Sequence, residues 1–140
     1  MSAPRVPNQR AIINRRALAE TIAELVEEHG AKARLNVLET LRSALDDGRE
    51  ELARRLSEKP GGGYECVHGH AFLMDQLIRL IHDYVTEHVH PAHNRTAAER
   101  LAVLAVGGYG RAEMAPHSDV DIAFITPMKR AREPSVSWLV

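Results

Sequence analysis

The sequence of 140 residues is poor in cysteine and in aromatic residues: Cys66 stands alone, and Phe, Trp and Tyr together make up 4%. A lone cysteine excludes an intrachain disulfide and is typical of proteins in a reducing compartment, so we expect a cytoplasmic protein. No apolar run approaches the roughly 20 residues of a membrane-spanning helix, which argues against a membrane partner. Residues 1–10 also lack the apolar stretch of a secretory signal.

An excess of positive charge is absent as well. Lys and Arg number 18 against 19 Asp and Glu, and the formal net charge is −1. Because nucleic acids and anionic membranes attract proteins with a positive excess, this balance argues against a nucleic acid partner. Hydrophobic residues, at 44%, and charged residues, at 26%, are present in the proportions of an ordinary globular domain.

Helical spacing of apolar residues dominates the first 95 residues. We predict about three helices there, over 11–28, over 31–59 and from 67 to about 90. His29-Gly30 is a stop signal after the first helix, and Pro60-Gly61-Gly62-Gly63 breaks the chain after the second. Asp46-Asp47-Gly48 interrupts the second pattern, which therefore corresponds to two shorter helices or to one bent helix.

Two short apolar runs follow, each with the features of a buried strand. Leu101 to Val106 is continuously apolar and precedes a glycine pair, whereas Asp119 to Thr126 alternates at first and then becomes apolar. Gly107-Gly108-Tyr109-Gly110 forms a turn after the first run, and we expect Tyr109 to pack against the helical region. The tail, 128–140, has no clear pattern.

The glycines and the Asp-x-Asp pair suggest a site for a nucleoside triphosphate and a metal. Glycines after a strand, here Gly107 and Gly108, let backbone amides approach a polyphosphate closely. On a strand, Asp119 and Asp121 would point to one face with Cα atoms roughly 6.5 Å apart. Such carboxylates repel each other unless a cation lies between them, and Mg²⁺ suits them because it also takes phosphate oxygens. We therefore predict nucleotidyl transfer with Asp119 and Asp121 as the catalytic metal ligands.

Two further residues are predicted to contact the nucleotide. Ser118 precedes the first aspartate and would hydrogen-bond a β- or γ-phosphate. Arg111 would neutralise phosphate charge, or would instead be a structural ion-pair partner. A glycine pair or an Asp-x-Asp pair alone is common, but both in this order, each attached to an apolar run, indicate nucleotidyl transfer.

The stretch from Leu104 to Ile125, LAVGGYGRAEMAPHSDVDIAFI, resembles a known family. It is similar to the bifunctional uridylyltransferase/uridylyl-removing enzymes of the nitrogen-signalling protein PII, within the DNA polymerase β-like nucleotidyltransferase superfamily. The resemblance implies that UMP is transferred from UTP to a tyrosine of PII with Mg²⁺, and that it is removed by hydrolysis when glutamine, the effector, is plentiful. It also implies that Asp119 and Asp121 bind the metal, and that Gly107, Gly108 and Ser118 contact the triphosphate.

The expected fold is α+β, with an N-terminal helical region over 1–95 and the start of a nucleotidyltransferase domain over 96–127. The second part would supply the first two strands of that family's mixed sheet, and 128–140 would be an atypical tail. The chain departs from the family at Ala112 and Met114, where glycine and leucine are frequent, and family members continue into a third carboxylate and further domains. We therefore expect a truncated or frame-shifted product or a fragment, inactive alone and unable to remove UMP.

Other functions remain open at this point. A different nucleotidyltransferase, of the antibiotic-modifying or antitoxin type, would share the glycine and aspartate motifs, because acceptor choice is not written in them. A non-catalytic helical interaction protein with a vestigial site is the second alternative. The histidines do not suggest a shared zinc site, since His68 and His88 would lie about 30 Å apart along one helix.

Overall fold

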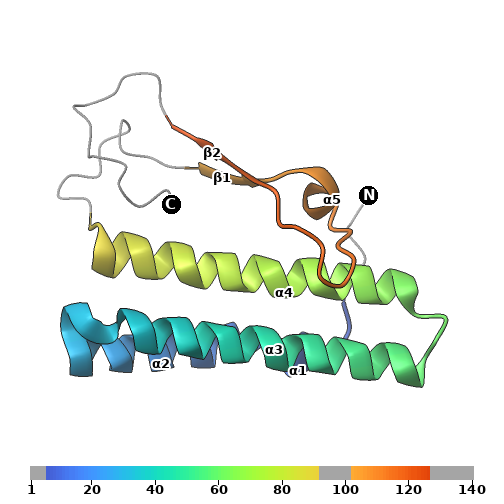
Figure 1. The fold of residues 1–140 in the computed structure, drawn as a ribbon, viewed down its shortest axis with the longest axis horizontal. Coiled ribbons are helices and arrows are strands. Elements are labelled where there is room, and N and C mark those ends of the chain that lie inside the picture. The colour runs from blue at the N-terminus through green and yellow to red at the C-terminus, as the bar shows by residue number, and fades with distance from the viewer. Residues whose placement is uncertain (1–5, 92–101, 127–140) are drawn as a thin grey trace.

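The computed structural model describes residues 6–91 and 102–126 of the chain. Figure 1 shows a layer of long helices with a small sheet beside it, so the expected α+β class is confirmed. The elements are, in order, α1 (Gln9–Ile12), α2 (Arg15–His29), the 3₁₀ helix η1 (Gly30–Ala33), α3 (Arg34–Glu58), α4 (Gly63–Tyr84), the π-helix η2 (Val85–Val89), β1 (Ala102–Ala105), α5 (Gly107–Gly110) and β2 (Ile122–Ile125). The expected divisions at 95/96 and 127/128 lie outside the described residues.

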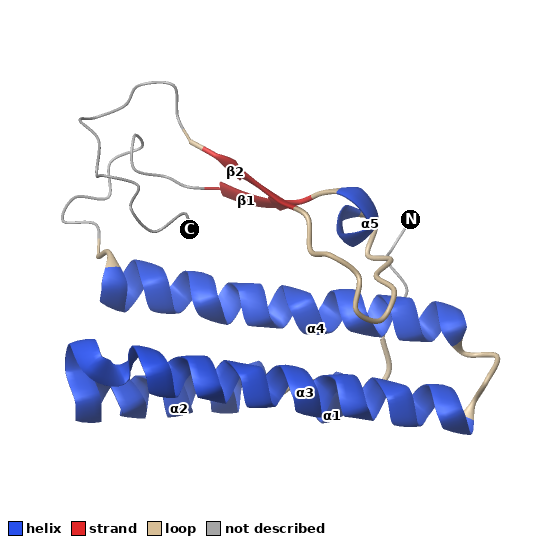
Figure 2. Ribbon diagram, viewed as in Figure 1, coloured by secondary structure: helices blue, strands red, loops and turns tan. Residues whose placement is uncertain are grey.

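Helix α4 occupies the centre of the molecule. It packs against α2 and α3 on one side, and the sheet lies over its other side (Figures 1 and 2). This arrangement agrees with its sequence, in which apolar residues form a face broad enough for two neighbours. Because both layers contact α4, this helix determines where the sheet lies relative to the helices.

The helical region has its own apolar core, in two adjoining clusters. The first joins α1, α3 and α4, and the second joins α2, η1, α3 and α4. Their buried residues are Val6, Ile12, Ile13, Ala44, Leu52, Leu73 and Leu77 in the first, and Ile22, Ala33, Val37 and Leu80 in the second. Burial of this apolar surface is the main stabilising contribution to the fold.

Helix α3 runs without interruption through Gly48. Of the two alternatives left by the sequence, two shorter helices are therefore excluded. Gly48 is buried, and a Cβ atom there would lie 2.6 Å from Leu73 Cδ1 and 2.9 Å from the carbonyl oxygen of Ile12. The glycine therefore permits close contact between α3, α4 and the end of α1. A sequence pattern alone cannot distinguish a glycine that breaks a helix from a glycine that close packing requires.

The other helix boundaries follow from local capping. Helix α2 begins at Arg15 rather than at Ala11, because the Asn14 side chain accepts a hydrogen bond from the Ala17 amide at 3.3 Å. It ends at His29, one residue beyond the predicted end, and Gly30 of the predicted stop signal follows with a φ of 55°. The third helix begins at Gly63, earlier than predicted, and its last turn widens into η2.

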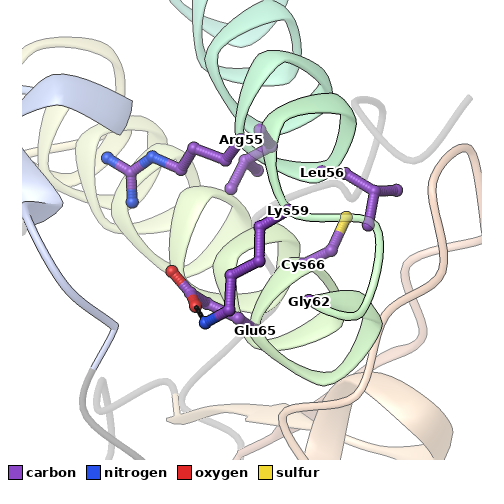
Figure 3. A pocket seen from close by; sticks show the side chains of 7 residues that line it. Arg55, Leu56, Lys59, Gly62, Glu65 and Cys66 are labelled. Carbon is purple, nitrogen blue, oxygen red and sulfur yellow. Dashed lines mark hydrogen bonds and ion pairs between the residues drawn. The ribbon is translucent and has the colours of Figure 1, made fainter.

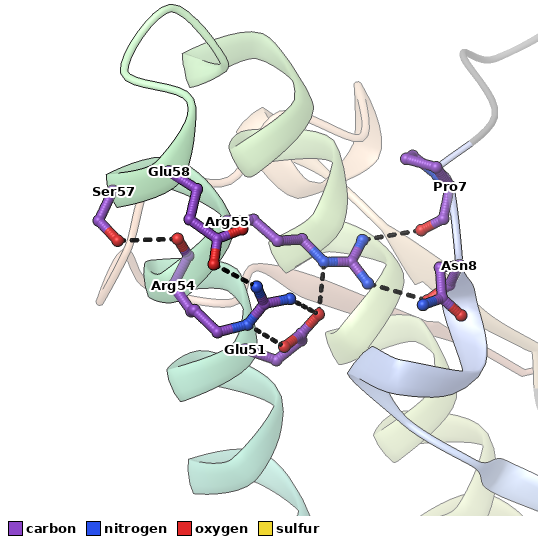
Figure 4. Close-up of polar contacts among 7 residues, drawn as sticks. All are labelled: Pro7, Asn8, Glu51, Arg54, Arg55, Ser57 and Glu58. Atoms are coloured by element: carbon purple, nitrogen blue, oxygen red, sulfur yellow. Dashed lines mark hydrogen bonds and ion pairs between the residues drawn. The ribbon is translucent and has the colours of Figure 1, made fainter.

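The segment before α2 is held against α3 by Arg55. Its guanidinium donates to the carbonyl oxygens of Pro7 at 2.7 Å and Asn8 at 2.9 Å, and to Glu51 Oε1 at 2.7 Å (Figure 4). Hydrogen bonds from Arg54, and then from Arg55, lower the pKa of Glu51 to about 2. Glu51 therefore stays ionised and orients both arginines, which fixes the short helix α1 across α3.

The sheet consists of two antiparallel strands, with Ala102 opposite Ile125 and Ala105 opposite Ile122. Residues directly opposite one another share a face, so Val103, Ala105, Ile122 and Phe124 lie on the α4 side, and Leu104 and Ile125 lie on the other. The prediction that both strands are buried is wrong, because Leu104 is 43% exposed and Ile125 is 54% exposed. On the α4 side, Ile122 and Phe124 are exposed as well, at 38% and 46%.

The aspartate strand also starts later than predicted. β2 begins at Ile122, so Asp119 lies in the preceding loop instead of on the strand. Leu101, the expected start of the first strand, is outside the described residues. None of the helices in the described part of the chain is long and apolar enough to cross a membrane.

Candidate functional site

The predicted glycine turn is a single helical turn, α5, that follows β1 directly. Gly107 has a φ of 61°, a left-handed conformation that glycine adopts readily and other residues rarely adopt. A Cβ atom at this position would lie 3.0 Å from Asp121 Oδ2. The turn and the second aspartate are thus in direct contact, and glycine is the residue that leaves room for the carboxylate.

Backbone hydrogen bonds fix the glycine turn beside Asp121. The amide of Val106 donates to the carbonyl oxygen of Asp121 at 3.0 Å, and the amide of Gly110 donates to Val106 at 2.9 Å. Gly108 accepts from the amide of Glu113 at 2.9 Å, and a Cβ atom on Gly108 would lie 2.9 Å from the Glu113 carbonyl oxygen. Close packing of the backbone therefore favours glycine at position 108, whereas the positive φ and the neighbouring Asp121 carboxylate favour it at position 107.

Both aspartates of the predicted metal site are exposed at one end of the sheet. Asp121 continues the pairing of β2 through its backbone, whereas Asp119 comes from the loop, so the same-face argument from strand geometry does not apply to Asp119. Among the described residues, no three His, Cys, Asp or Glu side chains are grouped to hold a metal ion. A magnesium site does not need three protein ligands, because Mg²⁺ usually binds one or two carboxylates and completes its shell with water and substrate phosphate.

For Arg111 the sequence allowed two roles, phosphate binding or a structural contact, and the structure shows a structural contact. It donates from Nη1 to the Gly107 carbonyl oxygen at 3.1 Å, and from Nε to Glu113 Oε2 at 3.4 Å. Ser118 is exposed, and its amide donates to the carbonyl oxygen of Ala115 at 3.1 Å. Arg111 therefore stabilises the glycine turn through its hydrogen bond to Gly107. Ser118 lies in the loop that leads to the aspartates.

Tyr109 packs against the helical region, as predicted. Its side chain is buried with Ala71 and Met114, and its hydroxyl donates to Asp75 Oδ1 of α4 at 2.7 Å. Burial, and then the bond to Asp75, raises the pKa of the Tyr109 phenol well above its usual value. The role of Asp75 as the partner of Tyr109 could not be predicted from the sequence, because nothing in the helical pattern distinguishes it and it lies 34 positions before Tyr109.

The loop between α5 and β2 is attached to the same helix. The Met114 amide donates to the carbonyl oxygen of Val67 at 3.2 Å, and Val120 packs on the cluster formed by Ala71, Tyr109 and Met114. Ala112 in this loop has a φ of 58°, so the residue found where relatives of the resembled family often have glycine adopts a glycine-like conformation. The whole segment from β1 to β2 is therefore positioned by α4.

Comparisons with known proteins agree with the motif. A bifunctional uridylyltransferase/uridylyl-removing enzyme of Novosphingobium aromaticivorans is 60% identical over 126 residues, and one of Erythrobacter litoralis is 58% identical over 130 residues. A third, from Rhodospirillum rubrum, is 45% identical over 131 residues. The chain is a homologue of one segment of these enzymes. The matches cover 90–93% of this chain and 14% of each relative, while no family model and no solved structure matches.

The candidate site is distinct from the two cavities of the described residues. A cleft of about 380 Å³ lies between α4 and the inner face of the sheet, and it includes Asp75, Asp83 and Tyr109 but neither Asp119 nor Asp121. A second hollow, of about 30 Å³, lies where α3 turns into α4 (Figure 3). It is lined by residues that include Lys59, Glu65 and Cys66, and it is large enough only for water.

Cys66 and His70, a cysteine and a histidine considered as reactive or metal-binding residues, are both buried in helix α4. Cys66 is buried, and burial raises the pKa of its thiol, which disfavours the reactive thiolate. His70 is buried in α4, and burial, Arg49 and His117 lower its pKa.

Proposed function

We propose that this chain carries the UTP- and magnesium-binding part of a uridylyltransferase, which transfers UMP from UTP to a tyrosine of the PII protein. The observation that supports this most directly is the close approach of Gly107 to the carboxylate of Asp121, where a Cβ atom on residue 107 would lie only 3.0 Å from Asp121 Oδ2. It places a glycine turn, which can bind phosphate, next to an exposed carboxylate, which can bind a metal ion. The names of the similar enzymes support transfer of a uridylyl group, and PII as the acceptor is part of this proposal, taken from the resemblance of Leu104 to Ile125.

In this proposal each site residue has a defined role. Asp119 and Asp121 hold Mg²⁺, which when bound would neutralise triphosphate charge and lower the pKa of the attacking hydroxyl. Gly107 and Gly108 allow the triphosphate to approach the backbone, and Ser118 donates to a phosphate oxygen. Arg111, which already contacts Gly107, adds positive charge beside the phosphates.

The full reaction cycle involves more than the described residues. The matched relatives are named for both addition and removal of uridylyl groups, and this chain corresponds to 14% of their length. We propose nucleotide binding for these 140 residues and little turnover, with PII as acceptor and glutamine as effector of the longer enzymes. A cytoplasmic location is proposed because Cys66 is the sole cysteine and is a free thiol.

Isothermal titration calorimetry with UTP and ATP tests the nucleotide class. We expect heat from UTP in the presence of Mg²⁺, at least a tenfold weaker response from ATP, and loss of the UTP signal when EDTA removes the metal. Preference for ATP would support a different nucleotidyltransferase. Absence of heat with either nucleotide at millimolar concentration would support a non-catalytic helical protein, and either result would contradict the proposal.

A further inference from the structure

The glycine turn is connected to the helical region by one side chain. The turn has the sequence Gly107-Gly108-Tyr109-Gly110, so Tyr109 is its only residue with a side chain beyond hydrogen. That side chain is 7% exposed, and its hydroxyl donates to Asp75 Oδ1 at 2.7 Å. Asp75 lies in the middle of α4, 34 positions earlier in the chain. A single hydrogen bond thus joins two distant segments at the proposed triphosphate-binding turn.

We propose that Tyr109 and Asp75 form a positioning pair, through which helix α4 fixes the glycine turn in the conformation that receives the nucleotide triphosphate. The inference rests on the proposed function and adds two residues to it. Neither residue is placed against substrate: Asp75 lines the cleft on the inner side of the sheet, and Tyr109 is buried in the cluster with Ala71 and Met114. Both act through the backbone of the turn.

A turn built from three glycines needs such a connection. Glycine has the largest backbone freedom of any residue, so an unattached Gly-Gly-x-Gly segment loses considerable entropy when it closes around phosphate. The buried ring of Tyr109 and its bond to a carboxylate restrict that freedom before any ligand arrives. Preorganised amides are the feature that makes such turns effective at binding anions.

The chemistry of the pair suits a constant rather than a switchable connection. Asp75 also forms an ion pair with Arg79 at 3.8 Å, so a positive charge lies beside the accepting carboxyl group. The pKa of Tyr109 is raised by burial and by Asp75, so the phenol keeps its proton and remains a donor at physiological pH.

A double-mutant cycle on nucleotide affinity tests the pair. Tyr109→Phe keeps the ring and removes the donor, and Asp75→Ala removes the acceptor, so each should weaken Mg²⁺–UTP binding by roughly 3- to 10-fold. The double variant should be no weaker than either single one, because both changes remove the same bond. Asp75→Asn retains an acceptor oxygen and should restore most of the affinity.

Asp83→Ala is the matched control. Asp83 is also an acidic residue of α4 on the same cleft, with ion pairs to Arg15 and His82, but it does not contact the turn. It should leave UTP affinity unchanged. Equal losses for Asp83→Ala and Asp75→Ala, or additive losses in the Tyr109 and Asp75 double variant, would contradict a specific pair.

Amide hydrogen exchange without nucleotide separates this inference from the proposed function. In Tyr109→Phe the amide of Gly110, which donates to Val106, should exchange about 3- to 10-fold faster, whereas amides around Leu52 in α3 should not change. Faster exchange in a protein that never binds UTP would uphold the positioning pair and reject the transferase proposal. Unchanged exchange at Gly110 would reject the pair, whatever the result with UTP.

Discussion

The helical region and the segment from β1 to β2 differ in how much apolar surface each buries by itself. Residues 6–91 bury a core of their own, in which Leu73 is 0% exposed and Leu52 is 2% exposed. The segment 102–126 buries only Tyr109 and Met114, and it does so against α4. The comparison teaches that the helices form a self-sufficient scaffold, while the candidate site takes its position from that scaffold.

A pair of leucine truncations tests this comparison with the largest expected effect. Leu73→Ala in α4 opens a cavity in the helical core and should lower the free energy of unfolding by about 2–5 kcal/mol. Leu104→Ala in β1 removes a side chain that is 43% exposed and should cost less than about 1 kcal/mol. Urea denaturation measures both, and similar losses would show that the two regions are equally important to stability.

A glycine pair sharpens the account of helix packing at an intermediate size. Gly48→Ala would place a Cβ atom 2.9 Å from the Ile12 carbonyl oxygen and should destabilise the fold by about 1–3 kcal/mol. Gly61→Ala is the control, because nothing lies within 4 Å of a Cβ atom there, and it should change stability by less than about 0.5 kcal/mol. If Gly48→Ala is neutral or stabilising in thermal unfolding, close packing is not the reason for this glycine.

The smallest effect is expected in the loop that leads to the aspartates. Ala112 has a φ of 58°, which costs a non-glycine residue roughly 1–2 kcal/mol. Ala112→Gly relieves this cost but increases the entropy of the unfolded chain, so a net stabilisation of roughly 0.5 kcal/mol is expected. Thermal unfolding of this variant against the unchanged chain measures it, and a clear destabilisation would show that Ala112 is not strained.

Much of the helical region could be predicted from the sequence, because helical periodicity and stop signals such as Gly30 act locally. The role of Gly48 could not be predicted, since it depends on Leu73 and Ile12 from other helices. The sequence also placed Asp119 on a buried strand, whereas the two-stranded sheet is largely exposed and β2 begins at Ile122. Strand burial depends on what covers the sheet, which an apolar run does not reveal.

The glycine turn and the packing of Tyr109 were predicted correctly from their place after an apolar run. The partner of Tyr109 was not, because Asp75 belongs to a helix whose sequence pattern gives no reason to select it. The contacts of Arg111 with Gly107 and Glu113 likewise could not be read from the sequence. Residue types that act through the backbone are visible in sequence, and the side chains that orient them are not.

Calorimetry of an Asp119→Asn, Asp121→Asn double variant is the most direct test of magnesium-dependent UTP binding by this chain. Its control is Asp46→Asn, Asp47→Asn, which makes the same chemical change on the exposed face of α3. The account predicts that the first variant loses at least about 10-fold in Mg²⁺-dependent UTP affinity with unchanged thermal stability, and that the control binds normally. Undiminished affinity in the first variant would contradict it.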